Sequence, residues 1–344
     1  RTNTNATFLQ NINVGVAITA GKLGIGFTDA NVKVGNTALD SLTTGNYNTA
    51  IGNQSLTANT SGSNNTAVGN ESLDANTAGA SNVAVGAAAL GENTTGTQNV
   101  AVGALTLDAS TTASYNTAIG HATLSANSTG ESNTAIGRAA LNANTTASNN
   151  TAVGRDALLS NTTGASNTAI GFEALKDSTT SSNNTAVGLQ SLLSNTTGIR
   201  NTAVGSGALD ANTEGEDNTA VGQNSQTRTT TGDGNTSVGR ESMDKNTTGS
   251  HNVAIGMYAL YANTTASNNV AVGKAALETN TTGTSNTAVG KNALYTNNAS
   301  NNTAVGTDAL YANTTGTQNT AVGHAALDAN TTGNYNSSLG RASL

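Results

Sequence analysis

The residues able to perform acid–base or nucleophilic chemistry are few and widely spaced in this chain. There are three histidines, His121, His251 and His324, and no cysteine. A catalytic nucleophile and its base must lie within hydrogen-bond reach. His121 and His324 share a repeat position but are 12 repeats apart, about 58 Å at the spacing of stacked strands. Zinc-ligand spacing and the glycine-rich calcium repeat are both absent. The sequence therefore predicts no enzyme, no cofactor and no metal site.

Acidic residues gather at one place in the chain. The members of this cluster are Asp210, Glu214, Glu216 and Asp217. Arg200 stands one repeat before Asp217, so the sequence favours an ion pair between these two side chains. A cation bridging Glu216 and Asp233, which occupy the same repeat position, is the alternative.

Three tyrosines are the candidate ligand contacts. Tyr261, Tyr295 and Tyr311 occupy one repeat position in three of four consecutive repeats, and Glu278 occupies it in the fourth. Tyrosine rings arrayed along a polar surface can stack on sugar faces. The alternative is that they cover the apolar residues beside them. The partner that this column predicts is a cell-surface glycan or a host receptor.

A repeat positions all of these side chains. The phrase Asn65-Thr66-Ala67-Val68-Gly69 recurs so regularly that its glycine appears 19 times, with 17 intervals of 17 residues and one of 16. A period this short is one turn of a solenoid. It leaves no room for a helix, and the β-branched residues favour strands. We therefore predict an all-β fold, a parallel β-roll or β-solenoid of about 19 turns over residues 31–344, with residues 1–30 as a cap or connector.

The strand of each repeat has two faces. Because side chains alternate along a strand, Thr66 and Val68 share one face and Ala67 takes the other. Thr alternates with Val at the first of these positions and Val with Ile at the third, and we predict that both columns point into the core. The Ala column would then face outward, where a second copy of the chain can pack against it.

An asparagine precedes every strand, and we call these residues the first Asn column. In a parallel, in-register stack its amides can hydrogen-bond along the rod, which predicts a structural ladder. The clearest members are Asn65, Asn82, Asn99, Asn116, Asn133, Asn150 and Asn167.

Composition narrows the partners further. The net charge is −7 and the pI near 4.8, which disfavours nucleic acid and anionic membranes. No apolar run approaches the roughly 20 residues of a membrane span, so we expect no membrane insertion in this segment. The start of the chain lacks the pattern of a signal peptide.

The repeats resemble those of two families of surface fibres. Val83-Ala84-Val85-Gly86 and Val253-Ala254-Ile255-Gly256 are similar to the head repeats of trimeric autotransporter adhesins, although this repeat is longer. The Asn-Thr-Ala-Val-Gly phrase with its Asn-Thr-Thr-Gly companion looks like the repeat regions of phage tail fibres. The resemblance implies a left-handed β-roll, assembled as a homotrimer or filament. It implies the shaft of an extracellular fibre, on a virion or a cell surface, that carries or displays a receptor-binding surface.

Two further features leave alternatives open. Stacked threonines also occur in ice-binding solenoids, and we disfavour that function because the Thr/Val column is predicted to be core. The Asn-x-Thr tripeptides match glycosylation acceptors, although the repeat already requires them as bend residues.

One repeat departs from the pattern. In this turn Gln226 replaces the Leu that stands four residues after the glycine in 17 of the 19 copies, and Arg228 follows it. We predict a local weak point there, and not a domain boundary, because the next glycine keeps its spacing.

Overall fold

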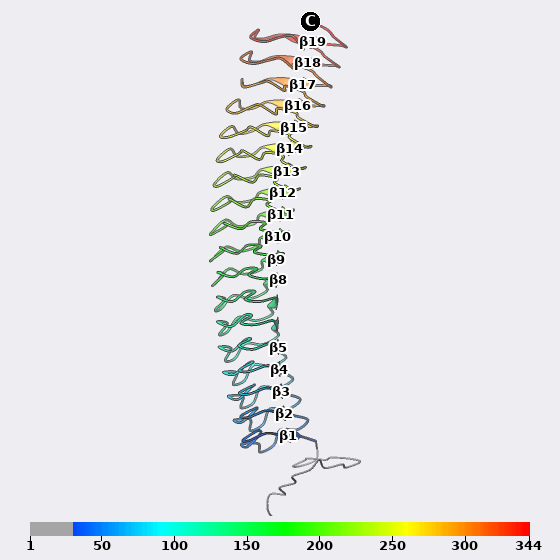
Figure 1. Cartoon of the computed structure of the whole chain (residues 1–344). Coiled ribbons are helices and arrows are strands. Elements are labelled where there is room, and N and C mark those ends of the chain that lie inside the picture. The colour runs from blue at the N-terminus through cyan, green and yellow to red at the C-terminus, as the bar shows by residue number, and fades with distance from the viewer. Residues whose placement is uncertain (1–29) are drawn as a thin grey trace, which may run out of the picture.

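The structure is a computed structural model that describes residues 30–344 of the chain. It is a single rod in which 19 short strands are stacked in sequence order, one per turn, and all of them belong to one parallel sheet (Figure 1). The predicted β-solenoid is confirmed. The predicted cap lies almost wholly outside the described residues.

Each strand has three residues, and the sheet runs from one end of the rod to the other. The strands are β1 Val32–Val34, β2 Thr49–Ile51, β3 Thr66–Val68, β4 Val83–Val85, β5 Val100–Val102, β6 Thr117–Ile119, β7 Thr134–Ile136, β8 Thr151–Val153, β9 Thr168–Ile170, β10 Thr185–Val187, β11 Thr202–Val204, β12 Thr219–Val221, β13 Thr236–Val238, β14 Val253–Ile255, β15 Val270–Val272, β16 Thr287–Val289, β17 Thr303–Val305, β18 Thr320–Val322 and β19 Ser337–Leu339.

The strands pair in register with the copies one turn away. Thr66 lies beside Val83 and Ala67 beside Ala84, and the same offset holds along the sheet. The 16-residue repeat does not disturb this register, because Thr287 still pairs with Thr303 and the missing residue is lost from a bend. At roughly 4.8 Å per step, the 18 steps from β1 to β19 span on the order of 90 Å.

The two faces of the strand are the reverse of what the sequence suggested. Ala67, Ala152 and the rest of the Ala column from β2 to β18 are fully buried, apart from Ser237, which replaces Ala and is also buried. The Thr/Val and Val/Ile columns are partly exposed, with Ile170 at 40% and Val204 at 37%. The prediction of an outward Ala column is therefore wrong. The reason is space, because only a small side chain such as Ala or Ser fits between the sheet and the Leu that stands four residues after the repeating glycine.

The core has one large apolar residue per turn. This is the Leu column, represented by Leu73 and Leu90, which packs against the small residues that precede it and against the Ala column. Hydrogen bonds between turns continue around the bend: Leu73 N–H donates to Ala89 O at 3.0 Å. The rod is thus bonded from turn to turn both in the strands and outside them.

The repeating glycine is required by the backbone. Gly137 has a φ of +128°, and a Cβ added there would lie 2.6 Å from the carbonyl oxygen of Gly154 in the next turn. Side-chain-bearing residues avoid this backbone conformation, and no neighbouring side chain can move to make room.

The described part of the chain contains no helix long and apolar enough to span a bilayer.

Candidate functional site

The three predicted tyrosines do not form one continuous array. The rings of Tyr295 and Tyr311 stack on each other, with centroids 5.2 Å apart and planes within 5°. Tyr261 packs edge-to-face on Tyr258 at 5.6 Å, and Lys245 Nζ lies 4.7 Å from its ring centroid. The structure therefore brings two of the three together and gives the third different neighbours.

Glu278 holds the repeat position between Tyr261 and Tyr295 and acts electrostatically on Tyr295. Its negative charge is the main cause of a raised pKa at the Tyr295 phenol. Burial in turn raises the pKa of the Glu278 carboxyl. The interruption is therefore a carboxylate coupled to Tyr295.

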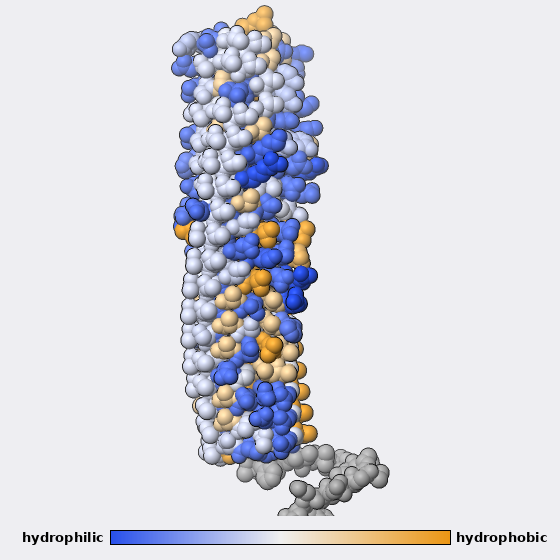
Figure 2. All heavy atoms as spheres, turned by 60° about the vertical axis from the view of Figure 1, so that its left-hand side comes forward, coloured by the Kyte–Doolittle hydropathy of each residue, from blue (hydrophilic) through white to orange (hydrophobic). Residues whose placement is uncertain are grey.

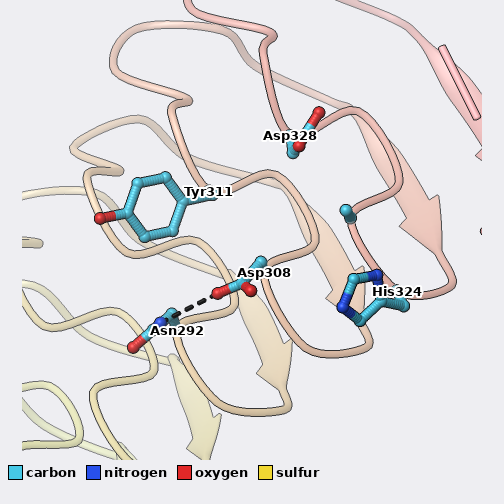
Figure 3. Close-up of a pocket in the computed structure, with 6 residues that line it drawn as sticks. Asn292, Asp308, Tyr311, His324 and Asp328 are labelled. Carbon is cyan, nitrogen blue, oxygen red and sulfur yellow. Dashed lines mark hydrogen bonds between the residues drawn. The ribbon is translucent and has the colours of Figure 1, made fainter. Parts of the chain in front are cut away.

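A surface recess of about 480 Å³ lies beside Tyr311 (Figure 3). Besides Tyr311 it is lined by Asn292, Asp308, His324, Ala325 and Asp328. Asn292 Nδ2 donates a hydrogen bond to Asp308 Oδ1 at 2.9 Å. The recess combines an aromatic ring with carboxylate, amide and imidazole groups, which are the groups that bind sugar hydroxyls and C–H faces.

The recess comes from residue size in one column. Asn292, Asp308 and Ala325 hold the same repeat position in three consecutive turns, and the small Ala325 leaves open the space above Asp308. The sequence analysis identified Tyr311 but not this recess. The sequence feature that could have indicated the recess is Ala325, which follows the polar Asn292 and Asp308 in one column next to the tyrosine column.

Two members of the acidic cluster, Glu216 and Asp217, form ion pairs with Arg200. Arg200 binds both neighbours: Nη2 lies 2.7 Å from Glu216 and Nε lies 2.6 Å from Asp217. Arg200 is also the main cause of a lowered pKa at Asp217. The Glu216 amide N–H donates to Asp233 Oδ1 at 2.8 Å, so Asp233 bonds to backbone. Among residues 30–344, no group of three or more His, Cys, Asp or Glu side chains is placed to hold a metal ion.

The amides of the first Asn column bond to the backbone. Asn65 N–H donates to Asn48 Oδ1 at 3.0 Å, and Asn65 Nδ2 donates to Gly79 O at 2.8 Å. Each side chain thus ties its turn to the next and also holds the last bend of its own turn. Because both amide atoms are buried and bonded, this column has no free group for a ligand.

A second buried ladder was missed by the sequence analysis. The Asn seven residues after each glycine, which we call the second Asn column, is also buried: Asn76 Nδ2 donates to Asn59 Oδ1 at 2.9 Å and to Gly79 O at 3.1 Å. The ladder has gaps where a shorter side chain replaces Asn. Asn93 Oδ1 and Asn161 Oδ1 have no partner, because Ser110 and Ser178 follow them. Regular spacing in a polar bend was the available signal.

The irregular turn places a polar group in the core. Gln226 is fully buried, its Nε2 donates to Thr219 O at 3.2 Å, and its Oε1 has no partner. Ser225 and Ser237 beside it hydrogen-bond to each other through their hydroxyls. The apolar core is divided here into one cluster that ends at Ala220 and another that begins at Met243. Arg228 is exposed.

The Asn-x-Thr tripeptides fall into two groups. In the second Asn column, residues such as Asn93 and Asn144 are fully buried, so the folded rod cannot carry a glycan there. Asn64, Asn149 and Asn183, each of which directly precedes a member of the first Asn column, are exposed. The alternative of a glycosylated surface is thus restricted to a few positions.

Hydrophilic side chains are unevenly distributed around the rod. Figure 2 shows a weakly polar strip that runs the length of the rod, with strongly hydrophilic groups and scattered hydrophobic ones beside it.

Comparison with protein-family models gives no match, and comparison with curated proteins gives none either. The function must therefore be argued from the geometry.

Proposed function

We propose that this chain is the shaft of an extracellular fibre, a rigid rod that holds a binding surface away from a virion or cell. The observation that supports it most is the unbroken stack of 19 in-register strands, which gives a long rod whose every turn is bonded to the next. Polar ladders extend along the interior, so stability is built turn by turn. This arrangement suits a spacer better than a catalyst.

The recess beside Tyr311 is the proposed ligand contact on this shaft. The Tyr295–Tyr311 stack fixes the ring, and Asp308 and Asp328 supply acceptors for sugar hydroxyls. We therefore propose a cell-surface glycan as the ligand of this segment. A glycan array should show binding that Tyr311→Ala abolishes. Tyr261→Ala is the matched control, because Tyr261 shares the repeat position but lies outside the recess. Equal loss in both variants, or no binding by the unmodified chain, would remove the carbohydrate role.

The proposal extends to assembly as a left-handed homotrimer or filament, which rests on the resemblance to fibre repeats. The Ala column cannot make the contact between copies, because it is inside the rod. Any such interface must use outward columns. Sedimentation equilibrium at micromolar concentration tests it, and a monomer would contradict it.

The shaft function itself is tested by immunogold electron microscopy of the intact parent particles or cells. An antibody raised against residues 31–344 should label thin surface fibres. Label confined to the interior would refute the proposal.

A further inference from the structure

The outward face of the sheet carries two side-chain columns over its whole length. The first is the Thr/Val column, with 13 Thr, five Val and the final Ser337. The second is the Val/Ile column, with 18 Val or Ile and the final Leu339. We call the two together the outer strand face.

The Thr hydroxyls of this face are free. In residues 30–344, none of the Thr/Val column's hydroxyls has a hydrogen-bond partner in the protein, although all but those of Thr320 and Ser337 belong to side chains that are only partly exposed. The first threonine of the bend, which directly follows the second Asn column, behaves differently. Thr77 Oγ1 donates to Thr94 O at 3.1 Å, and Thr162 Oγ1 donates to Thr179 O at 2.9 Å. The hydroxyls of this face are therefore free, whereas those of the first bend threonine are bonded to the next turn.

The spacing of these hydroxyls is regular. Eight consecutive strands, β6 to β13, all begin with Thr, from Thr117 to Thr236. In-register pairing repeats them at about 4.8 Å along the rod, and the Val/Ile column lies about 7 Å away across the strand. The 16-residue turn loses its residue elsewhere, so the lattice of this face remains continuous through Thr287 and Thr303.

Charge is absent from the face. Neither column contains an Asp, Glu, Lys, Arg or His in any of the 19 strands, although the chain has 33 Asp, Glu, Lys and Arg residues. The surface thus suits a neutral, periodic partner and offers nothing to a charged one.

We propose that the outer strand face orders water into a lattice and binds ice. Each Thr hydroxyl can donate and accept a hydrogen bond to a first-layer water. The methyl groups of Thr, Val and Ile restrict the orientation of the water next to them, because they offer it no hydrogen bond. This activity is separate from the shaft function and needs the face to stay uncovered in the fibre.

A second copy of the chain is the competing occupant of this face. Packing two such faces together would remove the 13 Thr hydroxyls from water, at a cost of roughly 1–3 kcal/mol for each one that finds no partner across the contact. Ordered water satisfies the same groups at little cost. The free hydroxyls therefore favour water over protein.

The test is thermal hysteresis of the purified chain, together with inhibition of ice recrystallisation. The unmodified rod should show both activities. Thr185→Tyr places a bulky ring in the middle of the eight-strand run and should remove most of the hysteresis. Thr197→Tyr is the matched control, because this exposed threonine lies in a bend away from the face, and it should leave the activity unchanged. Circular dichroism and light scattering establish that each variant keeps its fold and its oligomeric state.

Three results would overturn the proposal. The first is no hysteresis by the unmodified rod at millimolar concentration. The second is an equal loss in Thr185→Tyr and Thr197→Tyr. The third is an oligomer that Thr185→Tyr dissociates, because it would show that another copy covers the face.

Discussion

The clearest consequence of the structure concerns the interrupted core at Gln226. This side chain occupies the Leu column, is fully buried and keeps one amide oxygen without a partner. Replacing it with Leu should therefore stabilise the middle of the rod. The substitution joins the two apolar clusters that now end at Ala220 and begin at Met243.

The expected gain follows from three terms. Removing the unsatisfied buried oxygen stabilises the fold by roughly 1–3 kcal/mol, and losing the hydrogen bond to Thr219 destabilises it by about 1 kcal/mol. Added apolar burial contributes up to a further 1.5 kcal/mol or so, since the neighbouring serines remain polar. The net expectation is about 2 kcal/mol, which makes local opening roughly 30-fold rarer.

Native-state hydrogen exchange measures this quantity directly, because a long repeat array does not unfold in a single step. The amides of Gln226 and Thr229, which donate to Ser242 O and Gln226 O, report on the turn. Their exchange should slow in Gln226→Leu and stay unchanged in Gln223→Leu, an exposed position of the same turn. Gln226→Met, closer in shape to Gln, tests whether the fit of Leu limits the gain.

Unchanged or faster exchange in both Gln226→Leu and Gln226→Met would refute the reasoning. It would mean that the amide is already satisfied or that it leaves the core.

Three further predictions concern single residues. In a thermal melting experiment, Gly137→Ala should destabilise the rod by roughly 3 kcal/mol or more because of the backbone overlap with Gly154. Gly91→Ala is the control and should be neutral or slightly stabilising, because its added Cβ has no atom closer than 3.6 Å. Ser110→Asn should fill a gap in the second Asn column, pair with Asn93 Oδ1 and stabilise by about 1–3 kcal/mol, and Asn144→Ser should cost a similar amount in urea denaturation. Burial raises the pKa of Asp210, so ionisation of this carboxyl destabilises the fold at neutral pH, and the destabilisation is lost as the pH falls through the folded pKa. Asp210→Asn should therefore raise the melting temperature at pH 7. This difference should vanish near pH 3, below the ordinary Asp value of 3.8.

The fold could be predicted because the same short sequence pattern recurs in every turn. The spacing of the glycines and the β-branched strand residues predict a parallel solenoid, and the first Asn column follows from in-register stacking. Which face of the strand is inside could not be obtained in this way. Side chains alternate in either case, and the free energy of burying apolar surface favours Val and Ile over Ala in the core. The deciding factor is the width of the turn, which only the three-dimensional structure gives.

Two features of the bends could not be predicted from the sequence. The residues of the Leu column from Leu39 to Leu327 lie in the left-handed backbone region, with a φ of 51° at Leu73. Side-chain-bearing residues adopt this conformation only when their surroundings enforce it. Local sequence preference gives no hint of this, because contacts between turns impose it. The recess at Tyr311 likewise depends on Asp308 and Ala325 in successive turns, which become neighbours only through stacking.

The central claim is that the Ala column faces the interior of the rod and that the Thr/Val and Val/Ile columns face outward. Both the surface available for assembly and the ice-binding face depend on it. The chain has no cysteine, so single cysteines introduced at Thr185, Ala186 and Val187 can be compared by their rates of reaction with a maleimide. We predict rapid labelling at Thr185→Cys and Val187→Cys, and protection at Ala186→Cys until the rod is unfolded. Rapid labelling at Ala186→Cys with protection at the other two would contradict the account.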